Sequence, residues 1–151
     1  MTERRLLLVN GPSLNLLGTR QPDVYGSTTL AEIEANVAAA AAESGLQVRS
    51  VQSNHEGELI DWIQQARGKM AGIVINPAGY SHSSVALLDA LVACELPVIE
   101  VHLSNIFKRE AFRHHSFVSE AARGVICGLG PRGYLLALDA LADIIAAKKD
   151  A

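Results

Sequence analysis

Glu100 and His102 are two ionisable residues that stand two positions apart at the end of an apolar run. If this run is a β-strand, the two side chains project from the same face of the strand. A carboxylate beside an imidazole orients the ring and favours its charged form, as in a general acid or base. A single histidine at a strand end more often has a structural hydrogen-bonding role. The pairing with Glu100 makes catalysis the favoured interpretation, and the structural role remains its alternative.

Arginine and histidine side chains elsewhere in the chain are candidates for binding an anionic substrate. Arg20, His82 and Arg113 are the residues we select, because guanidinium groups bind carboxylates through two parallel hydrogen bonds. Arg20 and Tyr25 both lie in segment 14–26, where the apolar periodicity stops and Gly and Pro accumulate. A long loop of this kind in a small domain is commonly a lid or a binding loop. The sequence therefore predicts a lid that carries two candidate reagents.

Short β-rich runs alternate with amphipathic segments along the whole chain. The runs predict strands at 6–9, 47–52, 72–75, 97–101 and 124–127, and the amphipathic segments predict helices at 30–44, 56–67, 83–94 and 134–149. A short helix is expected near 108–113. Alternation of this kind predicts an α/β protein of one domain, 1–151, with a doubly wound five-stranded parallel sheet. Right-handed crossovers favour the flavodoxin-like strand order 2-1-3-4-5.

Local signals support these boundaries. Thr29 with Glu32, and Ser53 with Glu56, have the spacing of a capping box at a helix start. Gly45 is placed to end the first long helix. A GxGxxG motif begins at Gly128, but it follows the last strand, and no later strand carries the acidic residue of a dinucleotide site. A tight strand-to-helix turn is therefore the favoured interpretation of that motif.

Polar residues follow three of the predicted strands. Asn10 and Ser13 follow the first strand, Asn76 and His82 follow the third, and His102 follows the fourth. In the order 2-1-3-4-5 these ends are neighbours at the switch point, where open α/β sheets bind ligands. A phosphorelay receiver has the same fold but needs acidic residues after the first strand. Asn10 and Ser13 are not acidic, so the sequence argues against a receiver. The sequence predicts a small-molecule site at this edge.

Composition narrows the classes of partner. The chain has 16 acidic residues against 13 Lys and Arg, so it lacks the basic excess expected of a nucleic-acid binder. Cys94 and Cys127 lie in apolar surroundings without metal-ligand spacing, so we expect two reduced, buried thiols and no metal site. No apolar stretch is long enough for a membrane helix, and no signal peptide precedes the first strand. A cytoplasmic protein is expected.

The segment 83–94 is apolar on nearly all sides of its predicted helix. A domain of this size cannot bury such a helix completely, so we expect another subunit to cover part of it. Asp89 is then a single carboxylate at an interface, where an unpaired charge is costly. A purely structural ion pair with a partner arginine is the alternative for Asp89.

Three long motifs occur together in this chain: NGP…LNLLGTR…P..YG near its start, IEVHLSN at 99–105, and GVICGLG..GY near its end. Their combination resembles the type II 3-dehydroquinate dehydratases over essentially the whole length. The resemblance implies a subunit that assembles into trimers and then into dodecamers. It also implies removal of water from 3-dehydroquinate to give 3-dehydroshikimate, in the shikimate route or in quinate breakdown, without metal or organic cofactor.

The resemblance also implies roles for individual residues. Tyr25 would be the base, Arg20 would stabilise it, and His102, held by Glu100, would protonate the departing hydroxyl. The implied substrate-binding residues are Ser13, Asn76, His82, Asp89 (which would reach a neighbouring subunit's site), Leu103, Ser104 and Arg113.

The chain departs from the family's pattern at two positions. Ser13 replaces a usual Asn that helps to hold a water near the enolate, and Leu88 replaces a usual Arg beside Asp89. Serine is shorter but still forms hydrogen bonds, so reduced rather than absent turnover is expected from Ser13, whereas Leu88 argues against the family's intersubunit ion pair. A non-catalytic or weakly active ligand-binding paralogue is the main alternative, and a flavin-binding carrier is a more distant one.

Overall fold

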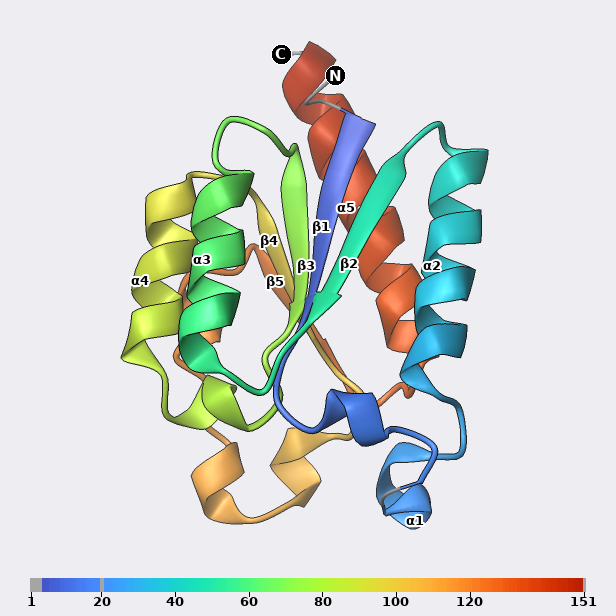
Figure 1. Ribbon diagram of the computed structural model, residues 1–151, viewed down its shortest axis with the longest axis vertical. Helices are drawn as coiled ribbons and strands as arrows, with labels where there is room; N and C mark the ends of the chain where they lie inside the picture. The colour runs from blue at the N-terminus through green and yellow to red at the C-terminus, as the bar shows by residue number, and fades with distance from the viewer. Residues whose placement is uncertain (1–3, 20, 151) are drawn as a thin grey trace.

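The computed structural model describes residues 4–19 and 21–150, with the side chains of residues 24, 25, 149 and 150 outside the description. Within that part of the chain, five parallel strands form one sheet in the order β2-β1-β3-β4-β5 (Figure 1). The strands are β1 (Arg5–Asn10), β2 (Gln47–Gln52), β3 (Gly72–Asn76), β4 (Val98–His102) and β5 (Gly124–Cys127). The predicted fold class and strand order are confirmed, and each predicted strand end lies within one residue of the observed one.

Long helices cover both faces of the sheet. One face carries α2 (Leu30–Glu43) and α5 (Arg132–Asp150), and the other carries α3 (Glu56–Ala66) and α4 (Val85–Cys94) (Figure 1). The alternation of β1 distributes its side chains between two cores. Leu6 and Leu8 belong to the core under α2 and α5, whereas Leu7 and Val9 belong to the core under α3 and α4. This period of two residues is what the apolar run predicted.

The start of α2 confirms its predicted capping box, but the start of α3 does not. The Thr29 hydroxyl accepts a hydrogen bond from the Glu32 amide at 3.2 Å. At α3, the N-cap is His55, and the Ser53 hydroxyl instead accepts from the His55 amide at 2.9 Å. The Ser53 amide donates to the Asn10 carbonyl at the end of β1, and the Glu56 carboxylate accepts from Ser84 Oγ, so the Ser53 amide and the Glu56 side chain are both engaged elsewhere.

The predicted irregular segment 14–26 contains two short helices, so the expectation of a structureless loop is wrong. They are the 3-10 turn η2 (Leu14–Leu16) and the single-turn helix α1 (Pro22–Tyr25). The helix expected near 108–113 is likewise two separate 3-10 turns, η4 (Ile106–Lys108) and η5 (Ala111–Arg113). One-turn elements are held by single i→i+3 or i→i+4 bonds and have no apolar periodicity, so the sequence pattern does not show them.

The GxGxxG motif forms a tight turn, as interpreted from the sequence. Gly128 and Gly130 have φ values of +87° and +63°, which favour glycine. Their amides donate to the carbonyls of His102 and Leu103. A Cβ on Gly128 would lie 2.9 Å from the Cβ of Asn105. The turn between β5 and α5 is therefore fastened to the end of β4.

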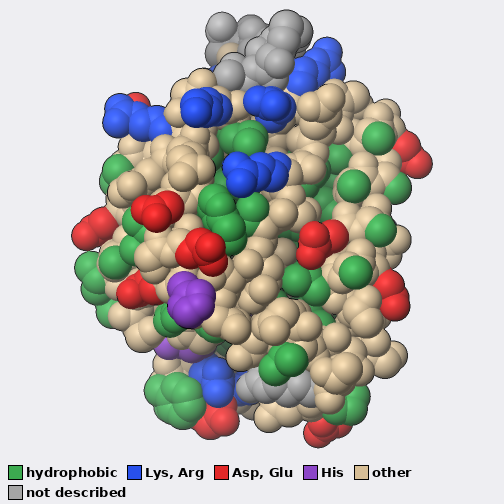
Figure 2. Space-filling view, viewed as in Figure 1, with side chains coloured by type: hydrophobic (Ala, Val, Ile, Leu, Met, Phe, Trp, Pro, Cys, Tyr) green, Lys and Arg blue, Asp and Glu red, His purple; other side chains and the backbone are tan. Residues whose placement is uncertain are grey.

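Charged side chains are unevenly placed on the face shown in Figure 2. Lys and Arg gather mainly at the end where the strands begin, whereas acidic groups are spread over the remainder. Cys94 is buried and Cys127 is half-buried, and both are free thiols, so the expected burial holds fully only for Cys94. Within the described residues, no helix has the length and apolarity needed to cross a membrane.

Candidate active site

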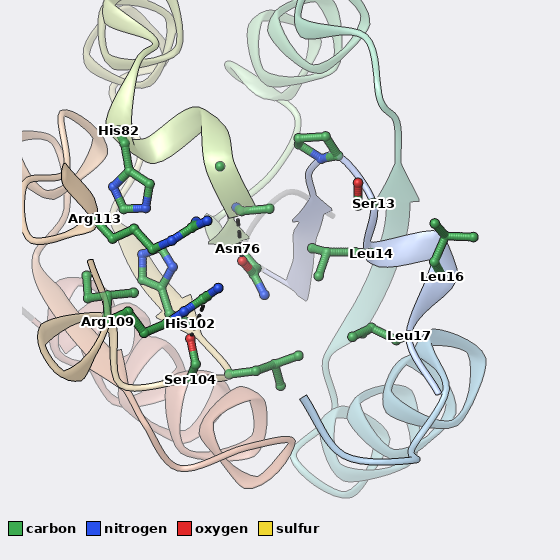
Figure 3. A pocket seen from close by; sticks show the side chains of 15 residues that line it. Ser13, Leu14, Leu16, Leu17, Asn76, His82, His102, Ser104, Arg109 and Arg113 are labelled. Atoms are coloured by element: carbon green, nitrogen blue, oxygen red, sulfur yellow. Dashed lines mark hydrogen bonds between the residues drawn. The ribbon is translucent and has the colours of Figure 1, made fainter. Parts of the chain in front are cut away.

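A cavity of about 240 Å³ opens at the carboxyl edge of the sheet (Figure 3). It lies beyond the ends of β1, β3 and β4, as the strand order predicted. Leucine side chains at η2 form one wall. Residues at the ends of β3 and β4, and residues that follow these strands, form the opposite wall. The lining includes Ser13, Leu14, Leu16, Leu17, Asn76, His82, His102, Leu103, Ser104, Arg109 and Arg113.

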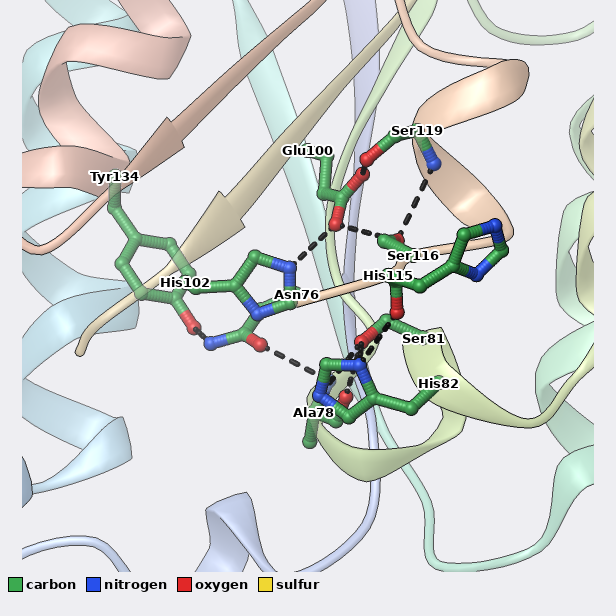
Figure 4. Close-up of polar contacts among 10 residues, drawn as sticks. All are labelled: Asn76, Ala78, Ser81, His82, Glu100, His102, His115, Ser116, Ser119 and Tyr134. Atoms are coloured by element: carbon green, nitrogen blue, oxygen red, sulfur yellow. Dashed lines mark hydrogen bonds and ion pairs between the residues drawn. The ribbon is translucent and has the colours of Figure 1, made fainter. Parts of the chain in front are cut away.

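Glu100 and His102 lie on the same face of β4, and the His102 Nε2 atom is hydrogen-bonded to Glu100 Oε2 (Figure 4). The Glu100 side chain is completely buried and His102 is buried except for 5% of its surface. Because Nε2 faces the carboxylate, Nδ1 is the ring nitrogen available to a bound substrate. The predicted carboxylate–imidazole pair is therefore present, and the ring lines the cavity.

Serine hydroxyls complete the surroundings of Glu100. Ser116 Oγ donates to Oε2 at 2.8 Å and Ser119 Oγ donates to Oε1 at 2.6 Å. Burial by itself raises the pKa of the Glu100 carboxyl, but the hydrogen bonds and the charge of His102 outweigh it and hold this pKa below its ordinary value. Glu100 is thus a fixed carboxylate that orients His102. Sequence reasoning missed Ser116 and Ser119, which lie at and beside η6 (Val118–Glu120).

His82 lines the cavity beside His102. The His82 Nδ1 atom lies 2.8 Å from the His115 carbonyl oxygen. The rings of His82 and His102 are stacked, with their centroids 6.4 Å apart. Burial is the main cause that lowers the pKa of His82, with the charges of His102 and Arg113 adding to it. A neutral His82 with Nδ1–H donating to the carbonyl fits this contact. His82 is therefore suited to hydrogen bonding rather than to holding a charge.

Two arginines line the cavity. Arg113 was predicted, and its Nε donates to Glu110 Oε2 at 2.7 Å. Arg109 was missed, although it lies only four residues before Arg113; its Nη1 donates to Ser104 Oγ at 3.3 Å. The side chain of Arg109 is 18% exposed and that of Arg113 is 25% exposed. Arg109 Nε also lies 4.0 Å from Glu110 Oε2, so a single carboxylate faces both guanidinium groups. Two arginines against one carboxylate make this side of the cavity suited to an anionic substrate.

Ser13 lines the cavity from a turn of unusual backbone geometry. Its φ is +68° and its ψ is −4°, the left-handed region that few non-glycine residues adopt. The Ser13 amide donates to Asn54 Oδ1 at 2.9 Å, and Gln52 Nε2 donates to the Gly11 carbonyl at 3.1 Å. A Cβ on Gly11 would lie 2.5 Å from the Pro77 carbonyl oxygen, so only glycine fits there. These contacts hold the turn against the ends of β2 and β3.

For two of the predicted site residues the structure gives no side-chain position, and a third lies away from the cavity. Arg20 lies outside the described residues, and only the backbone of Tyr25 is described, within α1. Figure 1 shows α1 at the same edge of the sheet as the cavity. Asp89 is exposed on α4 and does not line the cavity.

A doubly wound α/β domain with this cavity has the parts of an enzyme that uses acid–base chemistry on an anionic substrate. The histidine is oriented by a buried carboxylate, and arginines stand beside it. Residues 4–142 match the family model described as dehydroquinase class II. The chain belongs to the type II dehydroquinase family.

Close relatives agree with this membership. The chain is 61% identical over 140 residues to 3-dehydroquinate dehydratase 2 of Pseudomonas aeruginosa, covering 93% of this chain and 95% of the relative. It is 57% identical over 143 residues to 3-dehydroquinate dehydratase of Streptomyces coelicolor, covering 94% and 91%. The crystal structure of the type II dehydroquinase from Propionibacterium acnes superposes with a TM-score of 0.90 at 46% identity, covering 94% of this chain and 98% of that one.

Proposed function

We propose that this protein dehydrates 3-dehydroquinate to 3-dehydroshikimate through an enolate, by anti elimination and without a cofactor. The observation that carries the proposal is His102, oriented by the buried Glu100 carboxylate in a cavity that also holds two arginines. Such a site can protonate a leaving hydroxyl and bind a carboxylate at the same time. Family membership supplies the identity of the substrate.

In the proposed first step, the Tyr25 phenolate removes a proton from the carbon beside the ketone. A free phenol ionises near pH 10, and making a phenolate available two to three units lower requires about 3–4 kcal/mol. A guanidinium group near the phenol, in a site closed to water, would supply an interaction of that order, and the family resemblance assigns this role to Arg20. The electron pair of the broken C–H bond passes to the ketone oxygen and forms the enolate.

In the proposed second step, the enolate collapses and expels the hydroxyl group. The carbon–oxygen bond breaks with its electron pair, and His102 gives its proton to the departing oxygen, so water leaves. Glu100 stabilises the protonated ring before this transfer and fixes its orientation throughout. The proton held by Tyr25 returns to His102 through solvent before the next turnover.

Substrate binding is assigned to the remaining cavity residues. Arg113 and the Leu103–Ser104 backbone would hold hydroxyl and carboxylate oxygens, while His82 and Asn76 would offer neutral hydrogen bonds. Ser13 would hold the water that stabilises the enolate oxygen. These roles follow from the family resemblance and from the position of each residue in the cavity.

Purified protein mixed with 3-dehydroquinate tests the proposal. The product is a conjugated enone carboxylate, so its ultraviolet absorbance should rise with time and in proportion to enzyme concentration. Absence of a signal at high protein concentration would remove the assignment. Binding of 3-dehydroquinate without turnover would instead establish the ligand-binding paralogue that Ser13 leaves open.

Replacing Ser13 with asparagine should raise both stability and turnover. Asn adopts the left-handed region more readily than Ser, so the free energy of unfolding should rise by about 0.5–1 kcal/mol. Its longer amide should also hold the enolate water better and raise kcat several-fold. Urea unfolding and steady-state kinetics measure the two effects. Ser13→Gly is the control, since glycine relieves the backbone strain but supplies no side chain; equal kcat values for the two variants would contradict a role for the side chain.

We also propose that the exposed side of α4 is covered by another subunit in a homo-oligomer built from trimers. Leu87, Ala90, Leu91 and Cys94 pack into the core, but the opposite side exposes apolar residues. Val85 is 50% exposed and Val92 is 60% exposed. Asp89 lies on this side, so a neighbouring subunit would bury it or receive it at its own site.

Val92→Glu should therefore disrupt the oligomer, because a charge at a buried apolar interface is strongly unfavourable. Sedimentation velocity should show a smaller species, while circular dichroism should show a folded chain. Ala38→Glu, at an exposed position of α2, is the matched control and should keep the wild-type mass. Asp89→Ala should loosen the assembly to a lesser degree. An unchanged mass for Val92→Glu would exclude this side of α4 as the interface.

A further inference from the structure

A network of buried hydrogen bonds lies beneath the cavity and joins three elements that are far apart in the sequence. Asn76 Nδ2 donates to the Tyr134 hydroxyl at 2.8 Å, and that hydroxyl donates to Asn10 Oδ1 at 2.7 Å. The three side chains are at most 3% exposed. Asn76 ends β3 and lines the cavity, and Asn10 ends β1 beside it. Tyr134 lies in the first turn of α5, and Figure 4 shows its hydroxyl against Asn76.

One main-chain amide determines which group donates and which accepts in each hydrogen bond of this network. The Ala78 N–H can only donate, and it donates to Asn76 Oδ1 at 3.1 Å. Oδ1 of Asn76 therefore faces Ala78, and Nδ2 faces Tyr134. The tyrosine hydroxyl has one proton, which then goes to Asn10. Burial raises the pKa of the Tyr134 hydroxyl, so that proton stays in place near neutral pH.

Asn10 is the last residue of this hydrogen-bond network, and its side-chain amide is left with an unpaired N–H group. Its Oδ1 must face Tyr134, so its Nδ2 is turned away, and this buried Nδ2 has no hydrogen-bond partner among the described residues. A buried amide group without a hydrogen-bond partner is unfavourable, because it loses its hydrogen bonds to water on folding. The unpaired Nδ2 therefore indicates that the contact between Asn76 and the Ala78 amide sets the directions of these hydrogen bonds, and that the pairing of Asn10 does not.

We infer that Tyr134 is a positioning residue that fixes the amide of Asn76, and with it the hydrogen bonds that Asn76 offers to a bound substrate. With one Nδ2 proton given to Tyr134 and one Oδ1 lone pair given to Ala78, the amide plane cannot rotate or exchange its two ends. Asn76 then presents one N–H and one lone pair in fixed directions. The inference rests on the proposed function only in that Asn76 contacts 3-dehydroquinate.

Tyr134→Phe tests this inference, because it keeps the ring and removes both hydrogen bonds. The value of kcat/KM for 3-dehydroquinate should fall about tenfold, mainly through KM. The discriminating measurement is a double-mutant cycle with Asn76→Ala. In the Asn76→Ala background, Tyr134→Phe should change kcat/KM less than twofold. Equal effects in both backgrounds, or no effect in the wild-type background, would overturn the inference.

Loss of stability alone must be separated from loss of positioning. Leu138→Ala, one turn along α5 in the same core, is the matched control. It should lower the midpoint of urea unfolding by more than Tyr134→Phe does, yet change kcat/KM less than twofold below the unfolding transition. A fall in kcat/KM with Leu138→Ala as large as that with Tyr134→Phe would show a general effect of α5 packing and overturn the inference.

If Tyr134→Phe does not fold, Asn10→Ala provides the second test. It removes the acceptor of the Tyr134 proton and lets the hydroxyl turn toward Asn76, so kcat/KM should fall about threefold, again only when Asn76 is present. Unchanged kcat/KM in Asn10→Ala would count against the inference. Failure of the proposed function is distinguishable, because the wild-type protein would then show no turnover of 3-dehydroquinate.

Discussion

His102→Ala should lower kcat for 3-dehydroquinate by about 10²–10⁴-fold, the usual contribution of a positioned general acid. The departing hydroxyl would then have to leave without a proton from the enzyme. KM should change little, because Arg113 and Asn76 remain in the cavity to bind the substrate. Steady-state kinetics across pH measure the effect, and circular dichroism checks that the fold is retained.

Glu100→Gln is the matched variant for this prediction. Glutamine keeps the shape and a hydrogen bond to the ring but removes the charge that stabilises protonated His102. We expect a fall in kcat smaller than that of His102→Ala, because the ring keeps a hydrogen-bonded partner and loses only the charge beside it. If His102→Ala retained turnover near the wild-type value, another group would have to be the acid.

Tyr25→Phe should also lower kcat by about 10²–10⁴-fold, because it removes the proposed base. Phenylalanine keeps the aromatic ring and removes only the hydroxyl, so substrate binding and assembly should be preserved. Steady-state kinetics of both proteins with 3-dehydroquinate provide the measurement, and sedimentation velocity checks the assembly.

Asp23→Asn is the control on the same short helix. Asp23 is exposed in α1, and its substitution should leave kcat within about twofold of the wild-type value. A large loss with Asp23→Asn would show that the whole segment is sensitive to change. Near-normal turnover with Tyr25→Phe would show that the base is a different residue.

The positions of the polar residues at the strand ends were predictable, because they depend on two local rules. Side chains at i and i+2 share a face of a strand, which placed Glu100 and His102 together. Right-handed crossovers fixed the order β2-β1-β3-β4-β5, which brought Asn76 and Ser13 to the same cavity. Neither rule requires knowledge of the distant parts of the chain.

The surroundings of these residues were not predictable, because they come from segments without regular period. Ser116 and Ser119 reach Glu100 from the irregular region before β5, and Arg109 enters the cavity between two 3-10 turns. The predicted capping role of Ser53 failed for a related reason, since a hydrogen bond to Asn10 holds its backbone at the sheet. In each case a long-range contact outweighs the local signal.

The sequence by itself therefore determined the sheet, its order and the pairing of His102 with Glu100, since apolar period and chain handedness act over short distances. Only the tertiary structure decided how those groups are held. Tyr134 is separated from Asn76 by 58 positions and from Asn10 by 124, yet it joins both through a single hydroxyl. Such contacts form when packed elements bring buried polar groups together and burial makes every unpaired one unfavourable, a condition that no local pattern records.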